Sequence, residues 1–377
     1  MRIGIFETEH FEGAYPIIRL FDNGQHEITI FTYEKPYRQF RFLFGEQMNR
    51  YKWIVKKDDE NKYAFIKKIY RETRAAKLEL LYMNTVQDNH LFYACLVALL
   101  PKVRIVATLH DVNSYFRFRP ALSIRRWVRY IGKRFFISSV KEFNVVSDTM
   151  VSHLQSFLPA HKKVYSLPGA VYEMEKPYGC ISPADEGVVK LVVPGTIDGR
   201  RRDYEQVFEL LQACNLAGIN ISVVLLGGYY GEYGHMILEK CRVYAQQHNN
   251  LRFYTGLVDQ PEFDRVMNEA HLVFTPTVID TVLFDGIEET YGLSISSGNI
   301  FDIIKHAKPF ISPATLRVPD RLKSSCITYT SVEEICDFLR KSLHDASLYN
   351  ELSKEAELNS QKYTIARVRE RNPTLFA

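Results

Sequence analysis

Short runs of apolar and β-branched residues recur along the chain, separated by segments long enough to form helices. In the first half these runs occupy residues 3–6, 27–32, 53–55, 78–83, 103–109 and 143–146. In the second half they occupy residues 190–193, 221–226, 252–254, 272–275, 309–311 and 327–329. Nearly continuous apolar strands that alternate with helices indicate parallel sheets covered on both faces. The chain is therefore predicted to be α/β, with two doubly wound Rossmann-like domains facing each other across a cleft.

The periodic pattern breaks down between residues 168 and 187, which predicts a domain boundary there. Prolines and glycines interrupt this stretch at Pro168, Gly169, Pro177, Gly179, Pro183 and Gly187. We expect a first domain over residues 1–168 and a second over residues 169–356. A chain of 377 residues is long enough for each domain to bury its own core.

Polar turns follow most of the predicted strands. In open parallel sheets, ligands bind beyond the carboxyl ends of the strands. The turns of the first half are residues 7–14, 84–85, 110–113 and 147–148, and those of the second half are 195–204, 227–228, 255–256, 276–277 and 289–299. We expect the two sets to line the two sides of the cleft, where small-molecule chemistry commonly occurs.

The most informative turn is the last one, residues 289–309. Small polar residues, including Ser297, Gly298 and Asn299, precede an apolar-periodic segment that begins at Ile300. These residues are good helix starters. A helix N-terminus presents unpaired amides and a partial positive charge, which suits a phosphate or diphosphate. The alternative is an ordinary capped helix after a loop.

Composition and charge narrow the class of protein. The chain is 46% hydrophobic and 24% charged, as expected of a globular protein in water. Its six cysteines are scattered without a zinc-binding spacing, which favours reduced thiols in a reducing compartment. Residues 2–6 form a strand pattern rather than a signal peptide, so we expect a cytoplasmic protein. Residues 1–180 carry a net charge of +10 (28 basic, 18 acidic) and the remainder −6 (20 basic, 26 acidic), which suggests different partners for the two halves.

Motifs at the strand ends follow one another in an order that resembles a known enzyme family. They read NGQHEITI (23–30), TLHD (108–111), VVS (145–147), LPG (167–169), VPG (193–195), LLGG (225–228), FYTG (253–256), AHLVFTP (270–276) and ETYGL (289–293). Nearly end to end, the chain resembles GT-B-fold glycosyltransferases of the retaining, family-four kind. The resemblance implies a C-terminal helix over residues 357–377 that crosses back onto the first domain.

The chain departs from this family at three places. The family usually has a second glutamate eight residues after the first, where it holds the nucleotide ribose, but Ser297 stands at that position. Asp302 is a speculative substitute. The family's Gly-Arg after the first strand of the second domain is here Gly195 followed by a threonine, and the Gly-Gly of the first loop is replaced by FEGA around Gly13. These changes indicate a divergent subfamily.

The resemblance and the chemistry of the residues together assign candidate roles. Glu289 is expected to bind donor-sugar hydroxyls, with Glu288 as the competing acid, and His110 to contact the sugar or the attacking hydroxyl. Arg201 and Arg202 are expected to stabilise charge on the departing diphosphate, together with the amides of Ser297, Gly298 and Asn299, although the choice among Arg200, Arg201 and Arg202 stays open. The remaining candidates for nucleotide or sugar contact are Gly195, Gly227, Gly256, Tyr291 and Gly292. The arginines and acids could instead be solvated loop charges, and the histidine could be structural.

A basic segment suggests where the acceptor binds. Between Asp111 and Glu142 there is no acidic residue. On a helix from about Ala121, an apolar face of Ile124, Val128, Ile131 and Phe135 is expected, with Arg125, Arg126, Arg129 and Lys133 nearby. This pattern suits anionic headgroups or a polyprenyl-diphosphate acceptor, and we place Gly13 on the same acceptor side. The alternative is a basic surface helix packed on its own domain. No nucleic-acid-binding motif accompanies it.

Together these features predict a retaining glycosyltransferase. It would transfer a sugar from a nucleoside-diphosphate donor to a glycan or lipid-linked acceptor, as in surface-polysaccharide assembly, in the cytoplasm or at the inner face of the membrane. No Asp-x-Asp motif is present, and the fold generally needs no divalent ion, so neither metal nor cofactor is expected. The alternatives are a nucleotide-sugar epimerase on the same fold and a catalytically silent subunit that binds sugar nucleotides.

Overall fold

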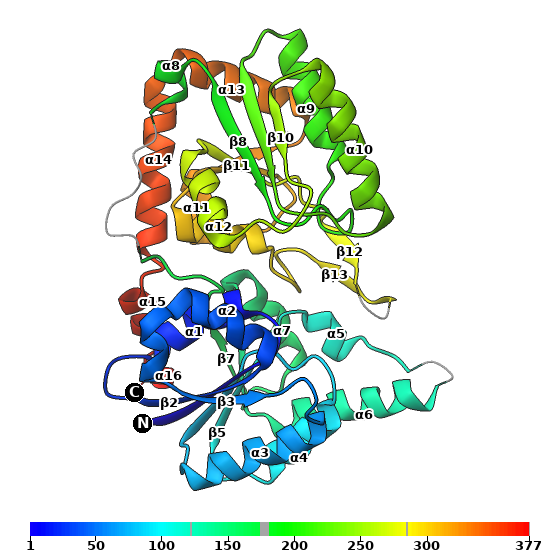
Figure 1. Cartoon of the computed structure of the whole chain (residues 1–377), viewed down its shortest axis with the longest axis vertical. Coiled ribbons are helices and arrows are strands. Elements are labelled where there is room, and N and C mark those ends of the chain that lie inside the picture. Colours follow the sequence, from blue (N-terminus) through cyan, green and yellow to red (C-terminus); the bar gives the residue numbers. More distant parts are fainter. Residues whose placement is uncertain (121–122, 174–180, 284–285, 377) are drawn as a thin grey trace.

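The first half of the chain forms a seven-stranded parallel sheet in the order β3-β2-β1-β4-β5-β6-β7 (Figure 1). The computed structural model describes residues 1–120, 123–173, 181–283 and 286–376. The strands are β1 (Arg2–Glu7), β2 (Glu27–Tyr33), β3 (Lys52–Lys56), β4 (Leu80–Met83), β5 (Arg104–Thr108), β6 (Glu142–Val145) and β7 (Lys163–Ser166). The helices are α1 (Phe11–Phe21), α2 (Glu34–Phe44), η1 (Gly45–Arg50), α3 (Lys62–Ala75), α4 (His90–Ala98), α5 (Val112–Phe116), α6 (Ile124–Ser139), η2 (Asp148–Met150) and α7 (Val151–Phe157).

The second half forms a six-stranded parallel sheet in the order β10-β9-β8-β11-β14-β15. Its strands are β8 (Val189–Pro194), β9 (Ile221–Leu226), β10 (Leu251–Phe253), β11 (Leu272–Phe274), β14 (Phe310–Pro313) and β15 (Cys326–Tyr329). Its helices are α8 (Pro183–Glu186), α9 (Glu205–Leu216), α10 (Gly231–Gln247), α11 (Gln260–Glu269), α12 (Gly298–His306), η4 (Asp320–Ser325), α13 (Val332–His344) and α14 (Ala346–Gln361).

Apolar residues pack on both faces of each sheet. In β1, Ile3 and Ile5 belong to one core and Phe6 to the core on the opposite face. In β8, Leu191 and Val193 face one core and Val192 the other. Alternate side chains of a strand point to opposite faces, so helices cover both sides of each sheet. The prediction of two doubly wound α/β domains is confirmed.

The structure adds strands that the apolar pattern did not predict. One is β7, at the edge of the first sheet. The others are β12 (Asp280–Val282) and β13 (Glu288–Thr290), which form an antiparallel hairpin with Thr281 opposite Glu289. This hairpin extends from the second domain toward α5 of the first (Figure 1), and it therefore determines where Glu289 lies.

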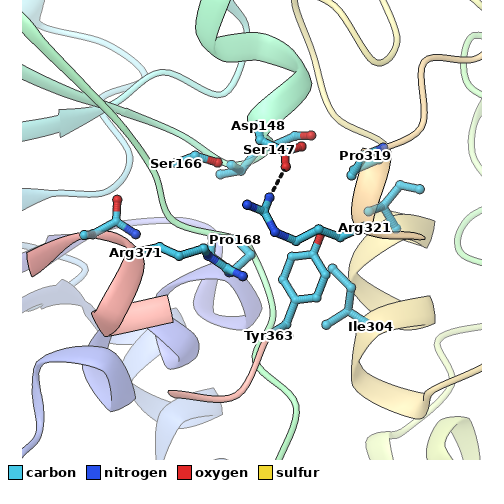
Figure 2. A pocket seen from close by; sticks show the side chains of 12 residues that line it. Ser147, Asp148, Ser166, Pro168, Ile304, Pro319, Arg321, Tyr363 and Arg371 are labelled. Carbon is cyan, nitrogen blue, oxygen red and sulfur yellow. Dashed lines mark hydrogen bonds and ion pairs between the residues drawn. The ribbon is translucent and has the colours of Figure 1, made fainter. Parts of the chain in front are cut away.

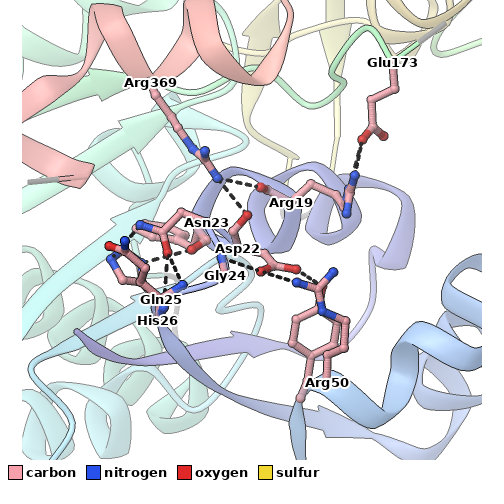
Figure 3. A network of polar contacts seen from close by, with 11 residues as sticks. Arg19, Asp22, Asn23, Gly24, Gln25, His26, Arg50, Glu173 and Arg369 are labelled. Atoms are coloured by element: carbon pink, nitrogen blue, oxygen red, sulfur yellow. Dashed lines mark hydrogen bonds and ion pairs between the residues drawn. The ribbon is translucent and has the colours of Figure 1, made fainter. Parts of the chain in front are cut away.

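The end of the chain returns to the first domain. Helix α14 packs on η4, α12 and α13 of the second domain, and α15 (Ile365–Arg371) and α16 (Pro373–Phe376) follow it. Arg369 donates to the carbonyl oxygens of Leu20, Arg19 and Asp22 at the end of α1, at 2.8, 3.2 and 2.9 Å (Figure 3). The segment that docks on the first domain thus follows Gln361, the last residue of α14.

A small cavity of about 180 Å³ separates the domains beside this crossing. Arg321 of η4 reaches across it to Asp148 of η2, with Nη1 and Oδ2 2.5 Å apart (Figure 2). Tyr363 and Arg371 of the C-terminal segment complete its wall. The two domains are therefore connected by an ion pair as well as by the chain.

Among the described residues, no helix is both long and apolar enough to cross a bilayer. Of the described cysteines, Cys214, Cys241 and Cys336 are buried, whereas Cys95 is exposed. Cys180 lies outside the described residues.

Candidate active site

The turns that follow the strands of the first domain, which we call the first-domain rim, are organised around Glu7, at the end of β1. This carboxylate is fully buried. One oxygen accepts from the amides of Glu9 and His10 at 2.6 and 2.9 Å. The other accepts from Asn84 Nδ2 and Thr85 Oγ1 at 2.6 and 2.8 Å. Glu7 therefore fixes both the loop that precedes α1 and the turn that follows β4.

His110 stands on the same rim, after β5. Its Nε2 lies 2.8 Å from the carbonyl oxygen of Asn84. Because a carbonyl can only accept, Nε2 carries the proton and a neutral ring presents Nδ1 as an acceptor. The ring of His10 lies beside it, with centroids 5.8 Å apart. His110 is thus a half-buried histidine held in one orientation by the main chain.

The second-domain rim combines Arg202 with the N-terminus of α12. The guanidinium is buried and donates to Asn299 Oδ1 and, at 3.2 Å, to the carbonyl oxygen of Thr196. Gly195 makes this position possible, because a Cβ there would lie 2.7 Å from Arg202 Nη2. Ser297 caps α12 without a side-chain hydrogen bond, and Gly298 is exposed with open space at its Cβ position. A guanidinium beside free helix-start amides is well suited to a phosphate.

The other two arginines of the loop point elsewhere. Arg200 pairs with Asp198 at 2.8 Å and stacks over the Tyr230 ring. The Arg201 side chain is 57% exposed and lies 3.7 Å from the same aspartate. Of the three arginines, Arg202 is the one in hydrogen-bonding contact with α12.

Asp302, one turn into α12, interacts electrostatically with charged residues of both domains. Burial raises its pKa to about 7, the positive charge of Arg202 opposes this, and Glu12 of α1 adds to it. Burial likewise raises the pKa of Glu12, and His10 opposes that rise. Asp302 therefore lies within electrostatic range of Glu12, and Glu12 within range of His10. A main-chain bridge between Asp111 and Ile295 brings the segment that precedes α12 next to the residue that follows His110.

Glu289 joins the two domains directly. Its side chain is 1% exposed, and its carboxylate accepts from the amides of Ser114 and Asn113 at 2.7 and 3.3 Å. Around it, Asn113 Nδ2 donates to the carbonyl oxygen of Glu288, and Val112 N donates to that of Ser294. We call this set of contacts the Glu289 clasp. Burial raises the pKa of Glu289 to about 7, and Asp111 adds to the rise.

The clasp changes the interpretation of Glu289 and Glu288. In this structure the Glu289 carboxylate binds main-chain amides of the first domain, so a donor sugar must share or replace those contacts. Glu288 is exposed and contributes only its main-chain carbonyl to the clasp. Sequence reasoning had no signal for this, because the partners are 175 residues or more away.

The structure places the remaining candidates for donor contact as follows. Tyr291 is buried in an apolar core of the second domain, within electrostatic range of Arg201 and Arg202. A Cβ at Gly227 would meet the Gly195 backbone at 2.5 Å, and one at Gly292 would meet the Arg317 carbonyl at 2.5 Å, so close backbone packing also accounts for both glycines. Gly256 has open space at its Cβ position, and a Cβ at Gly13 would lie 3.9 Å from Asn84 Nδ2.

Helix α6 also differs from expectation. It begins at Ile124, and Ala121 lies outside the described residues. Lys133 is 2% exposed and donates to the carbonyl oxygen and hydroxyl of Ser114, both at 2.8 Å. It therefore does not belong to the exposed basic face, whereas Arg125 is exposed and Arg126 and Arg129 are half-buried.

Sequence reasoning missed Glu7, His10 and Glu12 as individual residues. Their turn was recognised as polar, and the signal that was available is an acidic residue placed directly after the first apolar strand. A carboxylate at a strand end can hold neighbouring turns in place by accepting hydrogen bonds from their amide groups, as Glu7 does.

Residues 15–172 match the Glycosyltransferase Family 4 profile, whereas no curated protein matches the chain by sequence. Two solved glycosyltransferase-type structures share the fold, each with a TM-score of 0.56 over 100% of this chain and 97% of the other. They are the catalytic domain of starch synthase IV from Arabidopsis thaliana, bound to ADP and acarbose (10% identity), and a glycosyltransferase involved in avilamycin A biosynthesis (12%).

The fold is also shared with an enzyme of another class. The UDP-GlcNAc 2-epimerase of Neisseria meningitidis, bound to UDP-GlcNAc, has a TM-score of 0.60 and 10% identity, with 99% of each chain covered. At such identities the likeness concerns the fold. The first domain therefore resembles Glycosyltransferase Family 4, and the chain as a whole has the GT-B fold.

Proposed function

We propose that the protein is a retaining glycosyltransferase that takes a sugar from a nucleoside diphosphate and passes it to a lipid-linked glycan acceptor. The observation that carries this proposal is the pairing of Arg202 with the open start of α12, opposite the rim of His110. Sugar transfer leaves negative charge on the departing diphosphate. Fixed amides and a buried guanidinium stabilise that charge without reorganising.

The remaining residues have roles compatible with transfer. His110, held through Nε2, presents Nδ1 to a hydroxyl of the sugar or the acceptor. Asp302 lies within electrostatic range of Arg202, and we assign to it the role of the ribose-binding glutamate that the family has at the position of Ser297. Exposed arginines on α6 favour an anionic, membrane-linked acceptor, as in surface-polysaccharide assembly on the cytoplasmic side. The fold alone does not determine the reaction, so the proposal rests on the residues of the site.

A nucleotide-sugar epimerase is the second candidate. The structural likeness to the Neisseria epimerase extends over 99% of both chains. An epimerase interconverts free donors without an acceptor, whereas a transferase releases nucleoside diphosphate and needs an acceptor for rapid turnover.

Incubation with UDP-, GDP- and ADP-sugars, followed by chromatography of nucleotides and sugars, separates the candidates. We expect release of nucleoside diphosphate that increases when a polyprenyl-diphosphate-linked acceptor is added, and an axial or equatorial product linkage identical to that of the donor by NMR. Accumulation of an epimeric sugar nucleotide would favour the epimerase. Nucleotide binding without either product would indicate a silent binding subunit.

A further inference from the structure

Helix α6 has an inverted orientation, with apolar side chains outside and a lysine inside. Lys133, Gly132 and Phe136 are buried against the first domain. A Cβ at Gly132 would lie 2.7 Å from the amide nitrogen of Leu91, so α4 and α6 cross in close contact there. This contact and the Lys133–Ser114 hydrogen bonds fix the rotation of the helix.

The outer face of α6 carries a continuous apolar stripe. Its side chains have exposed fractions between 40% and 85%, and they are Ile124, Trp127, Val128, Ile131 and Phe135. Residues spaced by three and four lie on one face of a helix. We call this set the α6 stripe. Such a contiguous exposed apolar surface marks a contact with a membrane or another macromolecule.

The charge around the stripe favours an anionic partner. Arg125 and Arg134 of α6 are exposed, and so are Arg117 and Arg119 just before it. No acidic residue occurs between Asp111 and Glu142. A helix with an apolar stripe, an interfacial tryptophan and flanking arginines is typical of one that lies in the plane of a bilayer surface.

A cavity of about 720 Å³ opens beside the stripe, between the start of α4 and the first turns of α6. Arg125, Arg126 and Arg129 line it, and we call it the arginine cavity. Its acidic wall residue, Asp88, is already bound by Lys62 at 2.5 Å and Asn89 at 2.8 Å. The lining therefore has a net positive charge, which suits phosphate oxygens.

Two aromatic side chains extend the apolar surface at the edge of this cavity. Tyr63 of α3 and Phe92 of α4 are about half exposed, with ring centroids 4.4 Å apart. Both line the cavity together with Val128. Apolar groups next to an arginine-lined hollow match a ligand that has a phosphate and a hydrocarbon part.

We propose that α6 lies on an anionic bilayer, with the α6 stripe in the interfacial region and the phosphate of a lipid headgroup in the arginine cavity. This inference rests on the proposed lipid-linked acceptor and specifies the surface that would bring the enzyme to it. Bilayer binding itself requires no donor, so it can be tested separately from sugar transfer.

Vesicle co-sedimentation with the full chain tests the proposal. We expect binding to phosphatidylcholine vesicles that contain phosphatidylglycerol, little binding to pure phosphatidylcholine, and weakening by salt. An Arg125→Gln change should lower the partition coefficient about fivefold, as expected for one basic residue near an anionic surface. The pair Ile124→Asn and Ile131→Asn should lower it about tenfold or more. Leu216→Asn, an equally exposed apolar position on α9 of the other domain, is the matched control and should change nothing.

Several results would overturn the inference. One is the absence of vesicle binding, and another is equal binding by the α6 variants and the wild type. Stabilisation by inorganic diphosphate that Arg125→Gln abolishes, without vesicle binding, would assign the cavity to a soluble anion. A dimer in size-exclusion chromatography that the Asn pair converts to monomers, again without vesicle binding, would make the stripe a self-association face. Vesicle binding in a protein that turns over no sugar nucleotide would contradict the proposed function and leave this inference standing.

Discussion

Replacement of Glu289 by glutamine tests the clasp between the domains through its pH dependence. Burial raises the pKa of this carboxyl from 4.5 to about 7, so the folded protein binds its proton more tightly than the unfolded chain does. The resulting stability is fully present below pH 4.5 and is lost as the pH rises through about 7. A tenfold change in proton affinity is worth about 1.4 kcal/mol, so the wild type should lose about 2–3 kcal/mol from this group between pH 5 and pH 8.

The glutamine variant cannot lose that stability, because an amide does not titrate. It keeps one oxygen for the Ser114 amide and gives up the longer hydrogen bond from Asn113, a loss of about 1 kcal/mol. At pH 5 we therefore expect the variant to be slightly less stable than the wild type, and at pH 8 more stable. Asp111, whose pKa burial also raises, leaves a residual slope of the same sign in both proteins.

Urea unfolding at pH 5 and pH 8 measures this difference, followed by far-UV circular dichroism, which reports on the helices of both domains. The Glu262→Gln variant is the control. Arg265 and Tyr254 hold the pKa of that carboxyl down to about 2, so its contribution is lost only as the pH falls below 4.5, and this variant should keep the wild-type slope between pH 5 and pH 8. Identical pH slopes for the wild type and Glu289→Gln would refute the assignment of a buried, protonated Glu289.

Arg369→Ala should destabilise the first domain by about 2–3 kcal/mol, because three carbonyl oxygens at the end of α1 lose a charged donor. Replacement of the exposed Arg367 by alanine is the control. Equal effects of the two changes would contradict the docking of α15 on α1. Lys133→Met should loosen the Glu289 clasp, because Ser114 loses both hydrogen bonds from the lysine. We expect faster amide hydrogen exchange at residues 112–116 than in the wild type. Unchanged exchange there would show that the lysine does not hold this turn. Turnover of sugar nucleotide should persist in excess EDTA, as the absence of an Asp-x-Asp motif predicts. Loss of turnover in EDTA that is restored by added Mg²⁺ would show that the reaction needs a metal ion.

The strands of the two sheets were predictable because parallel strands buried on both faces read as continuous apolar runs. The apolar pattern missed strand β7 because its KVYS sequence is short and half polar, although the LPG motif directly after it was recognised. The β12–β13 hairpin was missed because the described strands, DTV and EET, contain few apolar residues.

The site was predictable in its location but only partly in its contacts. The start of α12 was expected among the small polar residues 296–299, and the helix begins at Gly298 with Ser297 as its N-cap. Periodicity identified an apolar stripe on α6 but not the direction it faces, which Gly132 and Leu91 determine by their close contact. Likewise, three consecutive arginines have equal chemistry in the sequence. Only the open position at Gly195 shows why Arg202 is the one that reaches Asn299.

The most direct test of the account is a calorimetric titration of UDP, GDP and ADP into the wild type and an Arg202→Lys variant. The account predicts that at least one of the three binds the wild type with one site per chain. It also predicts at least tenfold weaker binding to the variant, because lysine cannot make the two parallel contacts of a guanidinium. Arg265→Lys, an exposed arginine of α11, should bind like the wild type. Binding that is absent for all three nucleotides, or equally tight in the Arg202 variant, would contradict the assignment of a diphosphate to the start of α12.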